Sequence, residues 1–585
     1  MRKTKIVCTL GPATNDAEII KELIGNGLDA ARINFSHGTY ESLKVIINRL
    51  KEAREALNAP IPLILDTKGP EIRIKEIENN CAELKTGETF TLTTRDIIGN
   101  EKSAGITYKD LPGELSRDAR ILIDDGLIEL RVKSVSSEDI ECEIVNGGVI
   151  SSNKGINIPD VYVGLPSLTE KDIADIKFGI EEGFDYIAAS FIRKASDVTA
   201  IRRLLEENGG NKIAIISKIE NRDGVNNIDE ILEVSDGIMV ARGDLGVEIP
   251  PEEVPLVQKM LIKKAHKLSK PVITATQMLE SMIVNPRPKR AEASDVANAI
   301  FDGSDSIMLS GETAKGSYPI QAVAMMSRIA EKTESSIDYI KELSDLNFEQ
   351  SNITSAISYA ACATAAELNA VCISTITKSG FTARIISKFR PFCPIAASSS
   401  DPVVWRQLNL VWGCRPVLVH ELESSSEAFP LTMRTAVESG VAKNGDTVVV
   451  AMGVPVGISG TTNTLRVGIV GDVLCKGTGV GKKTVSARAR VINTLDEAEK
   501  KFKMGDILVT NSTRNDMMPY IKKASAIVVG PIEHTEGSHA EIVGNALDIP
   551  VVMCNSKVTS IIPDDTIITV NAGKGFIYEG IPTEE

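Results

Sequence analysis

Residues 212–244, KIAIISKIENRDGVNNIDEILEVSDGIMVARGD, contain two apolar runs separated by a helix-like stretch, and each run ends on charged residues. Apolar runs of this length are typical of strands buried on both faces of a parallel sheet. Eight strand–helix units close a (β/α)8 TIM barrel, so the sequence predicts that fold. The eight runs are KIVCTL (5–10), LDAARINFS (28–36), IPLILDT (61–67), DYIAASF (185–191), KIAIISKIE (212–220), DGIMVARGD (236–244), KPVITAT (270–276) and DSIMLSGET (305–313).

Polar side chains lie at the ends of these runs. The loops that follow the strands of such a barrel form the active site at one rim, so this arrangement predicts an enzyme. The residues expected to converge on that rim are Arg32, Asn34, Ser36, Asp66, Lys68, Lys194, Lys218, Glu220, Arg242, Asp244, Thr276, Ser310 and Glu312.

The composition of the 585 residues, 43% hydrophobic and 25% charged, is that of a globular protein. A net charge of −14 argues against nucleic acid or an anionic membrane as a partner. The basic N-terminus lacks the apolar run of a signal peptide, and no segment approaches the roughly 18 apolar residues of a membrane span. Nine cysteines without a CxxC motif favour reduced thiols in a cytoplasmic protein over disulfides or a zinc site.

The sequence predicts an α/β chain of four domains. The catalytic barrel is expected at 1–70 and 168–337. Between these segments, residues 71–167 alternate apolar and polar side chains, which predicts a small inserted β-barrel that acts as a lid. A separate three-layer α/β domain is expected at 338–474. The stretch CKGTGVGKK (475–483) is interpreted as a glycine-rich linker to an extra α/β domain at 484–585.

Two carboxylates and a lysine define the predicted chemistry. Lys218 and Glu220 are two residues apart in a predicted strand, so they share a face, and the next run brings Asp244 into range. Carboxylates without neighbouring histidine or cysteine suit Mg2+ or Mn2+. With the positive charge of Arg32 and Arg73, the set predicts metal-assisted phosphoryl transfer. A structural Lys218–Glu220 ion pair is the alternative.

Short motifs in the first 473 residues resemble those of the pyruvate kinase family, in the same order. The resemblance implies transfer of a phosphoryl group from phosphoenolpyruvate to ADP, giving pyruvate and ATP at the last step of glycolysis. It also implies a cytoplasmic, allosteric homotetramer that uses Mg2+ (or Mn2+) and K+. The motifs are TLGPA (9–13), ARINFSHG (31–38), LDTKGPEIR (65–73), SFIRKASDV (190–198), ISKIEN (216–221), VARGDLG (240–246), ATQMLESM (275–282), NPRPKRAEASDVANA (285–299) and LSGETAKG (309–316).

The resemblance also implies roles for single residues. Lys218 would stabilise the phosphoryl group in transit, and Glu220 and Asp244 would bind the divalent ion. Thr276 would lie beside the enolate, with a water chain to Ser310 and Glu312, and with the Gly243 backbone it would hold the substrate carboxylate. Arg32 and Arg73 would contact the phosphate. The nucleotide would lie against Pro12, His37, Arg73 and Lys194. The ligands of K+ would be Asn34, Ser36, Asp66 and Thr67.

Glu71 is the residue that relates to a requirement for a monovalent ion. Family members that need K+ carry a glutamate in the TKGPEIR motif, and members that do not need it carry a lysine there. The resemblance therefore implies that this chain depends on K+. A solvated loop acid is the alternative interpretation of Glu71.

The domain at 338–474 resembles the family's regulatory, effector-binding domain, and a polar loop in it could bind a phosphate. Its hydroxyls, lysine and helix-start amides come from Thr377, Lys378, Ser379, Gly380 and Thr382. A capping loop is the alternative. The later segment VPVGISGTTNTLR (454–466) lacks the Trp and Arg that precede Thr-Asn-Thr in members responding to fructose bisphosphate. We therefore expect a sugar monophosphate or AMP as the effector.

The last hundred residues resemble the mobile phosphohistidine domain of phosphoenolpyruvate synthase and pyruvate phosphate dikinase. The resemblance covers GDILVTNSTRNDMMPYIKKASAIVV (505–529) and EGSHAEIVGNALDIPVV (536–552), and His539 aligns with the phosphate-carrying histidine. Glu536 and Glu541 replace a glycine and an alanine, and a carboxylate beside a phosphohistidine is unfavourable. A structural or interaction role is therefore expected for this domain.

Two other function classes are weighed against phosphoryl transfer. A carbon–carbon lyase barrel acting on pyruvate also places Glu and Asp on a metal, but it has no use for a nucleotide-side Arg/Lys cluster. ADP dependence separates that enzyme from a kinase. A phosphocarrier or regulatory scaffold built around the last domain would show transfer of labelled phosphate to His539.

Overall fold

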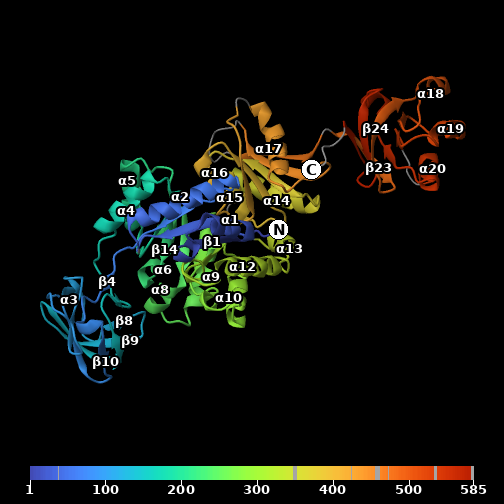
Figure 1. The fold of residues 1–585 in the computed structure, drawn as a ribbon. Coiled ribbons are helices and arrows are strands. Elements are labelled where there is room, and N and C mark those ends of the chain that lie inside the picture. The colour runs from blue at the N-terminus through green and yellow to red at the C-terminus, as the bar shows by residue number, and fades with distance from the viewer. Residues whose placement is uncertain are drawn as a thin grey trace. The chain divides into compact units, whose positions relative to one another are not determined.

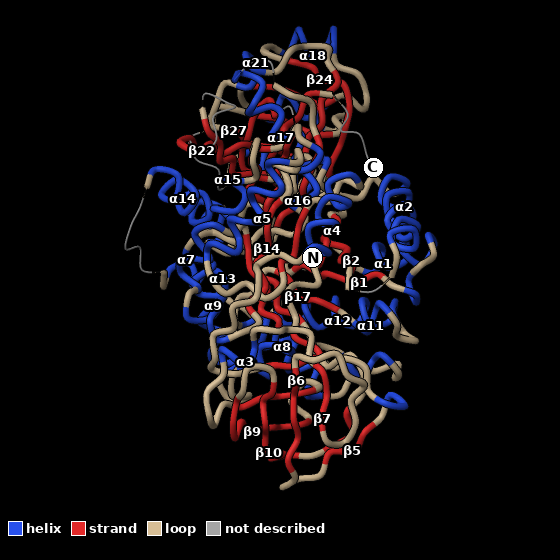
Figure 2. Tube along the Cα trace, turned by 90° about the vertical axis from the view of Figure 1, so that its left-hand side faces the viewer, coloured by secondary structure: helices blue, strands red, loops and turns tan. Residues whose placement is uncertain are grey.

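The computed structural model describes residues 1–36, 38–346, 352–422, 425–454, 462–471, 473–532 and 537–580. Eight parallel strands close into a barrel in the order β1-β17-β16-β15-β14-β13-β3-β2, which confirms the predicted fold class (Figure 1; Figure 2). The strands are β1 (Lys5–Leu10), β2 (Ala30–Asn34), β3 (Leu63–Asp66), β13 (Tyr186–Ala189), β14 (Ala214–Ile219), β15 (Gly237–Ala241), β16 (Val272–Ala275) and β17 (Ser306–Leu309).

Two layers of apolar side chains hold the barrel. Alternate strand residues face opposite sides, so Val7 and Ile216 belong to the interior cluster, whereas Cys8 and Ile215 belong to the outer one. The helices of this part are α1 (Ala17–Asn26), α2 (Tyr40–Ala56), α4 (Glu170–Glu181), α5 (Ala195–Glu207), α6 (Arg222–Asn226), α7 (Ile228–Val234), α8 (Arg242–Glu248), α9 (Val254–Lys267), α10 (Arg290–Phe301), α11 (Gly311–Ala314), α12 (Pro319–Glu334) and α13 (Tyr339–Ser344). Among the described residues, no helix combines the length and apolar character needed to cross a membrane.

The β domain inserted between β3 and α4 contains a seven-stranded sheet in the order β4-β12-β8-β9-β10-β6-β7. A bridge between Ile74 and Ile106 joins the chain beyond its two edge strands, so the sheet curls into a small barrel. A second sheet pairs β11 with β5. The elements are β4 (Ile72–Arg73), β5 (Ala82–Leu84), β6 (Thr89–Thr93), β7 (Ser103–Gly105), α3 (Leu111–Glu114), β8 (Arg120–Ile123), β9 (Ile128–Val135), β10 (Asp139–Asn146), β11 (Gly148–Ile150) and β12 (Gly155–Asn157).

A five-stranded sheet in the order β20-β19-β18-β21-β22 follows along the chain. Two compact units divide this segment: unit 1 comprises 1–362, 375–422 and 452–463, and unit 2 comprises 363–374, 423–451 and 464–585. The predicted domain at 338–474 is therefore shared between the units. Its elements are α14 (Ile353–Glu367), β18 (Cys372–Ile376), α15 (Phe381–Lys388), β19 (Ile395–Ser399), α16 (Pro402–Leu408), β20 (Cys414–Leu418), α17 (Ala428–Glu438), β21 (Thr447–Gly453) and β22 (Thr462–Ile469).

The last domain is a second closed barrel, in the order β23-β27-β26-β25-β24-β28-β29. The expected linker at 475–483 is wrong, because 473–480 form β23, paired with β27 and β29. A Cβ on Gly477 would meet the Met553 carbonyl oxygen at 2.1 Å, so glycine here permits close backbone approach. The elements are β23 (Val473–Val480), β24 (Thr484–Val491), α18 (Leu495–Lys501), β25 (Ile507–Thr510), α19 (Met518–Ile521), β26 (Ala526–Val529), α20 (His539–Leu547), β27 (Val551–Cys554), α21 (Val558–Ile561), β28 (Ile567–Asn571) and β29 (Phe576–Glu579).

Candidate active site

Three charged side chains point into the mouth of the barrel from neighbouring parts of the sheet. Arg32, Asp66 and Lys218 each follow by two residues a side chain of the interior cluster, namely Ala30, Ile64 and Ile216. Because strand residues two apart share a face, all three side chains are directed inward at the carboxyl ends of their strands. The strands thus bring together residues that are almost two hundred positions apart.

Lys218 lies at the centre of this cluster. Its Nζ is 3.1 Å from Asp66 Oδ1 and 2.9 Å from Glu220 Oε1, and it donates a 2.7 Å hydrogen bond to Ser190 Oγ. Burial acts to lower the pKa of the ammonium, but the Asp66 and Glu220 carboxylates outweigh it and raise that pKa. Lys218 therefore stays charged at physiological pH. Ser190 was not predicted, although it occupies the next inward position after β13.

Asp66 forms ion pairs with two side chains, those of Arg32 and Lys218. Its Oδ2 lies 2.5 Å from Arg32 Nε, and Arg32 Nη1 donates a 2.8 Å hydrogen bond to Thr9 Oγ1. Burial acts to raise the pKa of Asp66, but the positive charges of Arg32 and Lys218 hold it below its ordinary value. The ionised carboxylate consequently fixes the guanidinium and the ammonium side by side.

Glu220 and Asp244 form the predicted carboxylate pair. Burial raises the pKa of Glu220; Lys218 opposes the shift and the Asp244 charge adds to it. Burial also raises the pKa of Asp244, which lies in the first turn of α8. Glu220 Oε2 accepts a 2.6 Å hydrogen bond from the Phe191 amide, whose φ of +54° is unusual for a residue with a side chain. The two acids are close enough to repel each other.

A divalent cation would relieve this repulsion, so the donor set fits such an ion. Within the described ranges, no group of three or more His, Cys, Asp and Glu side chains is arranged to hold a metal. Glu220 and Asp244 would supply two carboxylates, and the remaining positions on the ion would be taken by water and substrate. That division is usual for Mg2+.

Thr276 is held in a strained position beside Gly243. Its φ is +69°, and its Oγ1 accepts a 2.8 Å hydrogen bond from the Gly243 amide. Arg242 donates to the Thr276 carbonyl at 2.7 Å and forms two 2.7 Å bonds to Asp295. Backbone strain of this kind persists where the surroundings enforce it, often at functional sites. Asp295, which lies within the NPRPKRAEASDVANA motif, thus holds the Arg242 side chain that contacts Thr276, a contact that the spacing did not indicate.

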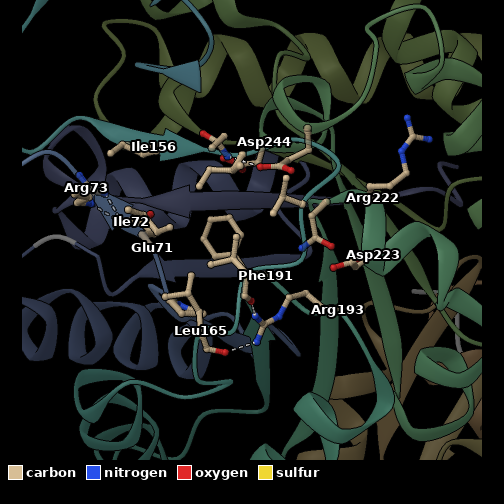
Figure 3. A pocket seen from close by; sticks show the side chains of 18 of the residues that line it. Glu71, Ile72, Arg73, Ile156, Leu165, Phe191, Arg193, Arg222, Asp223 and Asp244 are labelled. Atoms are coloured by element: carbon tan, nitrogen blue, oxygen red, sulfur yellow. Dashed lines mark hydrogen bonds and ion pairs between the residues drawn. The ribbon is translucent and has the colours of Figure 1, made fainter. Parts of the chain in front are cut away.

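A cavity of about 660 Å3 lies between the barrel rim and the inserted domain, both in unit 1. Its volume is within the ~300–1,000 Å3 range of small-molecule sites. Figure 3 shows Glu71 and Arg73 together on one side of the cavity, with Phe191 in the middle of the view and Asp244 above it. Arg73 Nη2 lies 2.6 Å from Glu71 Oε2, and its Nη1 donates to the Asn153 carbonyl. Arg73 therefore faces the cavity without joining the Lys218 cluster in the described structure.

The predicted monovalent-cation ligands lie at the ends of β2 and β3. Asn34 pairs in register with Asp66, and its Oδ1 accepts a 2.9 Å hydrogen bond from the Ser36 amide. Thr67 Oγ1 accepts a 3.1 Å hydrogen bond from the Ser190 amide, which links it to the neighbourhood of Lys218. The four oxygen-bearing residues thus come from adjacent segments of the rim.

The other predicted rim residues are more dispersed. Pro12 begins a 3-10 turn (Pro12–Thr14) after β1, and Lys194 Nζ lies 3.2 Å from Tyr162 Oη of the inserted domain. Glu312 accepts hydrogen bonds from the Leu279 and Ser310 amides, and burial raises its pKa. His37 lies outside the described residues.

The predicted effector loop connects β18 to α15. The Thr377 amide donates a 2.9 Å hydrogen bond to the Ser398 carbonyl, and Thr382 Oγ1 lies 2.8 Å from Thr462 Oγ1. Gly380 has a φ of +75°, which favours glycine, and Lys378 is exposed. Most of the later segment, residues 455–461, lies outside the described part of the chain.

His539 is the first residue of α20. Its Nδ1 lies 3.0 Å from Thr513 Oγ1 and its Nε2 lies 3.0 Å from Asn515 Oδ1. Glu541 Oε2 accepts a 2.7 Å hydrogen bond from the Gly537 amide, so this carboxylate caps its own helix. Glu536, the other departure from the phosphohistidine pattern, lies outside the described residues. Both ring nitrogens of His539 are engaged, which suits a structural histidine.

Comparison with known proteins gives matches along almost the whole chain. Family models match at 1–323 (pyruvate kinase, barrel domain), 355–468 (pyruvate kinase, alpha/beta domain) and 502–575 (PEP-utilising enzyme, mobile domain). Pyruvate kinases of Geobacillus stearothermophilus and Sporosarcina psychrophila are 49% and 48% identical, each over 99% of both chains.

A solved structure agrees with these matches. The crystal structure of a pyruvate kinase from Cryptosporidium parvum is 40% identical, with a TM-score of 0.76, over 80% of this chain and 96% of that one. The sequence motifs, the barrel and the full-length relatives therefore agree. The chain belongs to the pyruvate kinase family, whose members are transferases.

Proposed function

We propose that the chain transfers the phosphoryl group of phosphoenolpyruvate to ADP, giving pyruvate and ATP. The observation that carries this proposal is the Lys218 ammonium, held between Asp66 and Glu220 at the barrel mouth. The bond between phosphorus and the enol oxygen breaks, a bond to a terminal oxygen of ADP forms, and the enolate carbon takes up a proton. A lactate dehydrogenase-coupled assay tests this: pyruvate should form only with ADP and a divalent cation, and pyruvate formation without ADP would favour a lyase.

The charged residues have different roles in this transfer. Lys218 and Arg32 neutralise charge on the phosphoryl oxygens, and Arg73 contributes from the inserted domain across the cavity. Such fixed charges need no reorganisation during reaction and provide most of the catalysis in phosphoryl transfer. Glu220 and Asp244 hold Mg2+ or Mn2+, which supplies positive charge to substrate oxygens.

The strained Thr276 and the Gly243 amide orient the substrate carboxylate, and Thr276 lies near the site of enolate protonation. Pro12, His37, Arg73 and Lys194 line the nucleotide side. The inserted domain limits loss of the phosphoryl group to water by covering the cavity. Movement of that domain over the rim would be visible as a change in small-angle scattering when both substrates bind.

K+ dependence is expected because Glu71 neutralises nearby cations. Its carboxylate lies 2.6 Å from Arg73 and 3.8 Å from Lys68, so added positive charge must come from an ion bound at Asn34, Ser36, Asp66 and Thr67. Replacing K+ with tetramethylammonium should lower kcat at least about tenfold, which corresponds to ~1.4 kcal/mol. Glu71→Lys should retain most of its rate without K+. Equal wild-type rates in the two buffers would reject the monovalent site.

Removal of the last domain should leave turnover largely intact. Because β23 begins at Val473, the cut belongs after Gly471 rather than at the expected linker. We expect kcat to change less than about threefold, under ~1 kcal/mol, since no proposed catalytic residue lies beyond 471. His539→Ala in the full-length chain is the matched control. Near-total loss of turnover in a folded truncation would assign this domain a catalytic role.

The proposal extends to regulation and assembly on the strength of the family resemblance. We infer a cytoplasmic homotetramer regulated by a monophosphate at Thr377, Lys378, Ser379, Gly380 and Thr382. Sedimentation velocity measures the assembly state. Titration with AMP and with hexose monophosphates measures the response, and an unchanged KM for phosphoenolpyruvate with every compound would rule out this effector class.

A further inference from the structure

A second cavity lies at the opposite end of the barrel from the Lys218 cluster. It encloses about 260 Å3 and belongs wholly to unit 1. One wall consists of residues at the starts of four adjacent strands, including Tyr186 of β13, Ala214 of β14 and Pro271 before β16. The other wall includes Phe381 and Arg384 of α15.

Basic side chains dominate the lining of this cavity. It contains Arg202, Lys212, Lys270 and Arg384, and its single acidic side chain is Asp236. This excess of positive charge occurs in a chain whose net charge is −14. Local charge decides what such a cavity attracts, because distant charges are screened within about 8 Å at physiological ionic strength.

Two of the four cations have no carboxylate partner among the described residues. Arg202 pairs with Asp236, and Lys212 pairs with Asp401 outside the cavity lining. Lys270 Nζ instead donates to main-chain carbonyls, including that of Ser235 at 2.6 Å. Arg384 Nη1 donates to the Ser379 carbonyl at 3.1 Å.

The surroundings of Lys270 destabilise the charged form of its side chain. Burial lowers its pKa; Asp236 opposes this shift, and the guanidiniums of Arg384 and Arg202 add to it. An anion between Lys270 and Arg384 would remove this penalty and make charge-assisted hydrogen bonds to both groups. The cavity thus has an excess of positive charge, because Asp236, which pairs with Arg202, is the one acidic side chain of its lining.

We propose that this cavity binds a small phosphate ester, with its phosphate between Lys270 and Arg384. Two unpaired cations match a dianionic group, and the side chains of Phe381, Leu268 and Pro271 supply apolar surface for the rest of the molecule. The volume lies just below the usual ~300 Å3 minimum of drug-sized sites, which favours a compact ester.

Binding there would connect α15 to the strands that carry the proposed catalytic residues. The strands that start at this cavity lead to Ser190, Lys218, Gly243 and Thr276 at their other ends. The ligand would therefore bridge α15 and the bases of β13 to β16. The cavity adjoins the predicted effector loop, because Ser379 is part of its lining, but the Thr377 and Lys378 side chains of that loop do not line it.

A tryptophan reporter tests the proposal independently of catalysis. Leu268 lines the cavity and is 46% exposed, so Leu268→Trp places a fluorophore there with little cost to folding. The full-length variant is titrated with glucose 6-phosphate, and in a second arm with inorganic phosphate. We expect a saturable fluorescence change with the ester, and an affinity at least about tenfold lower when Arg384→Met is added.

Two further variants make the outcome decisive. Lys378→Met, in the neighbouring loop, should leave the affinity unchanged, and Arg384→Lys should retain part of it; thermal unfolding verifies that each variant is folded. No saturable change up to about 10 mM ester, or equal affinity in Arg384→Met, would overturn the proposal. Inorganic phosphate binding as tightly as the ester would overturn the ester assignment.

Discussion

Lys218→Met should lower kcat about a thousandfold while the chain remains folded. The ammonium is the one group that contacts Asp66, Glu220 and Ser190 together at the barrel mouth in the described structure. Its loss removes a fixed charge from the position where the phosphoryl group is transferred, which corresponds to ~4 kcal/mol in the barrier. Steady-state kinetics with saturating phosphoenolpyruvate, ADP, Mg2+ and K+ measures the effect.

Lys5→Met is the matched control. Lys5 is also a buried barrel lysine, with its Nζ donating to the Cys414 carbonyl at 2.7 Å, but it lies at the start of β1, away from the rim. Its replacement should lower stability and leave kcat nearly unchanged. Similar kcat values for Lys218→Met and the wild type would refute the role assigned to the ammonium, and equal losses in both variants would indicate a general folding defect.

Glu220→Gln should weaken Mn2+ binding at least about a hundredfold. Groups that only hydrogen-bond to the ligands of a metal already contribute about ten- to a hundredfold to affinity, and a carboxylate that binds the ion directly contributes more. The substitution preserves shape and leaves Lys218 paired with Asp66, so the barrel should remain intact. Free Mn2+ measured by electron paramagnetic resonance gives the affinity without any need for turnover.

Glu248→Gln is the control for this measurement. Glu248 lines the cavity beside which Asp244 lies, burial raises its pKa as it does that of Glu220, and its Oε1 accepts a 2.8 Å hydrogen bond from Asn157. If any buried acid near this cavity bound the ion, both variants would lose Mn2+ equally. The proposal expects the loss in Glu220→Gln alone, and unchanged affinity in that variant would remove Glu220 from the metal site.

The alternation of residues within each strand predicted which side chains point into the barrel mouth. The alternation that buries Ile216 also directs Lys218 inward, and the same rule applies to Arg32 and Asp66. Contacts between residues of different strands could not be predicted from this alternation. Ser190 opens the motif SFIRKASDV, and its bond to Lys218 depends on the closure of the barrel, which no local pattern specifies.

The glycines of residues 475–483 did not indicate whether this stretch is a linker or a strand. The stretch 475–483 was interpreted as a linker, yet 473–480 form a strand of the last barrel. Glycine is typical both of flexible linkers and of strands that approach another backbone closely. At Gly479 a Cβ would meet the Ala572 carbonyl oxygen at 1.7 Å, and this contact depends on a segment about ninety residues away. Composition alone could not separate the two cases.

The proposed mechanism requires Glu220 and Asp244 to bind one divalent ion, with the Lys218 ammonium beside the phosphoryl group that is transferred. Anomalous diffraction from crystals grown with Mn2+ and phosphoenolpyruvate tests this most directly. We predict a single strong peak at about 2.1 Å from carboxylate oxygens of both acids, with the phosphate next to the Lys218 ammonium. A peak bound elsewhere, or a phosphoenolpyruvate complex without metal between Glu220 and Asp244, would contradict it.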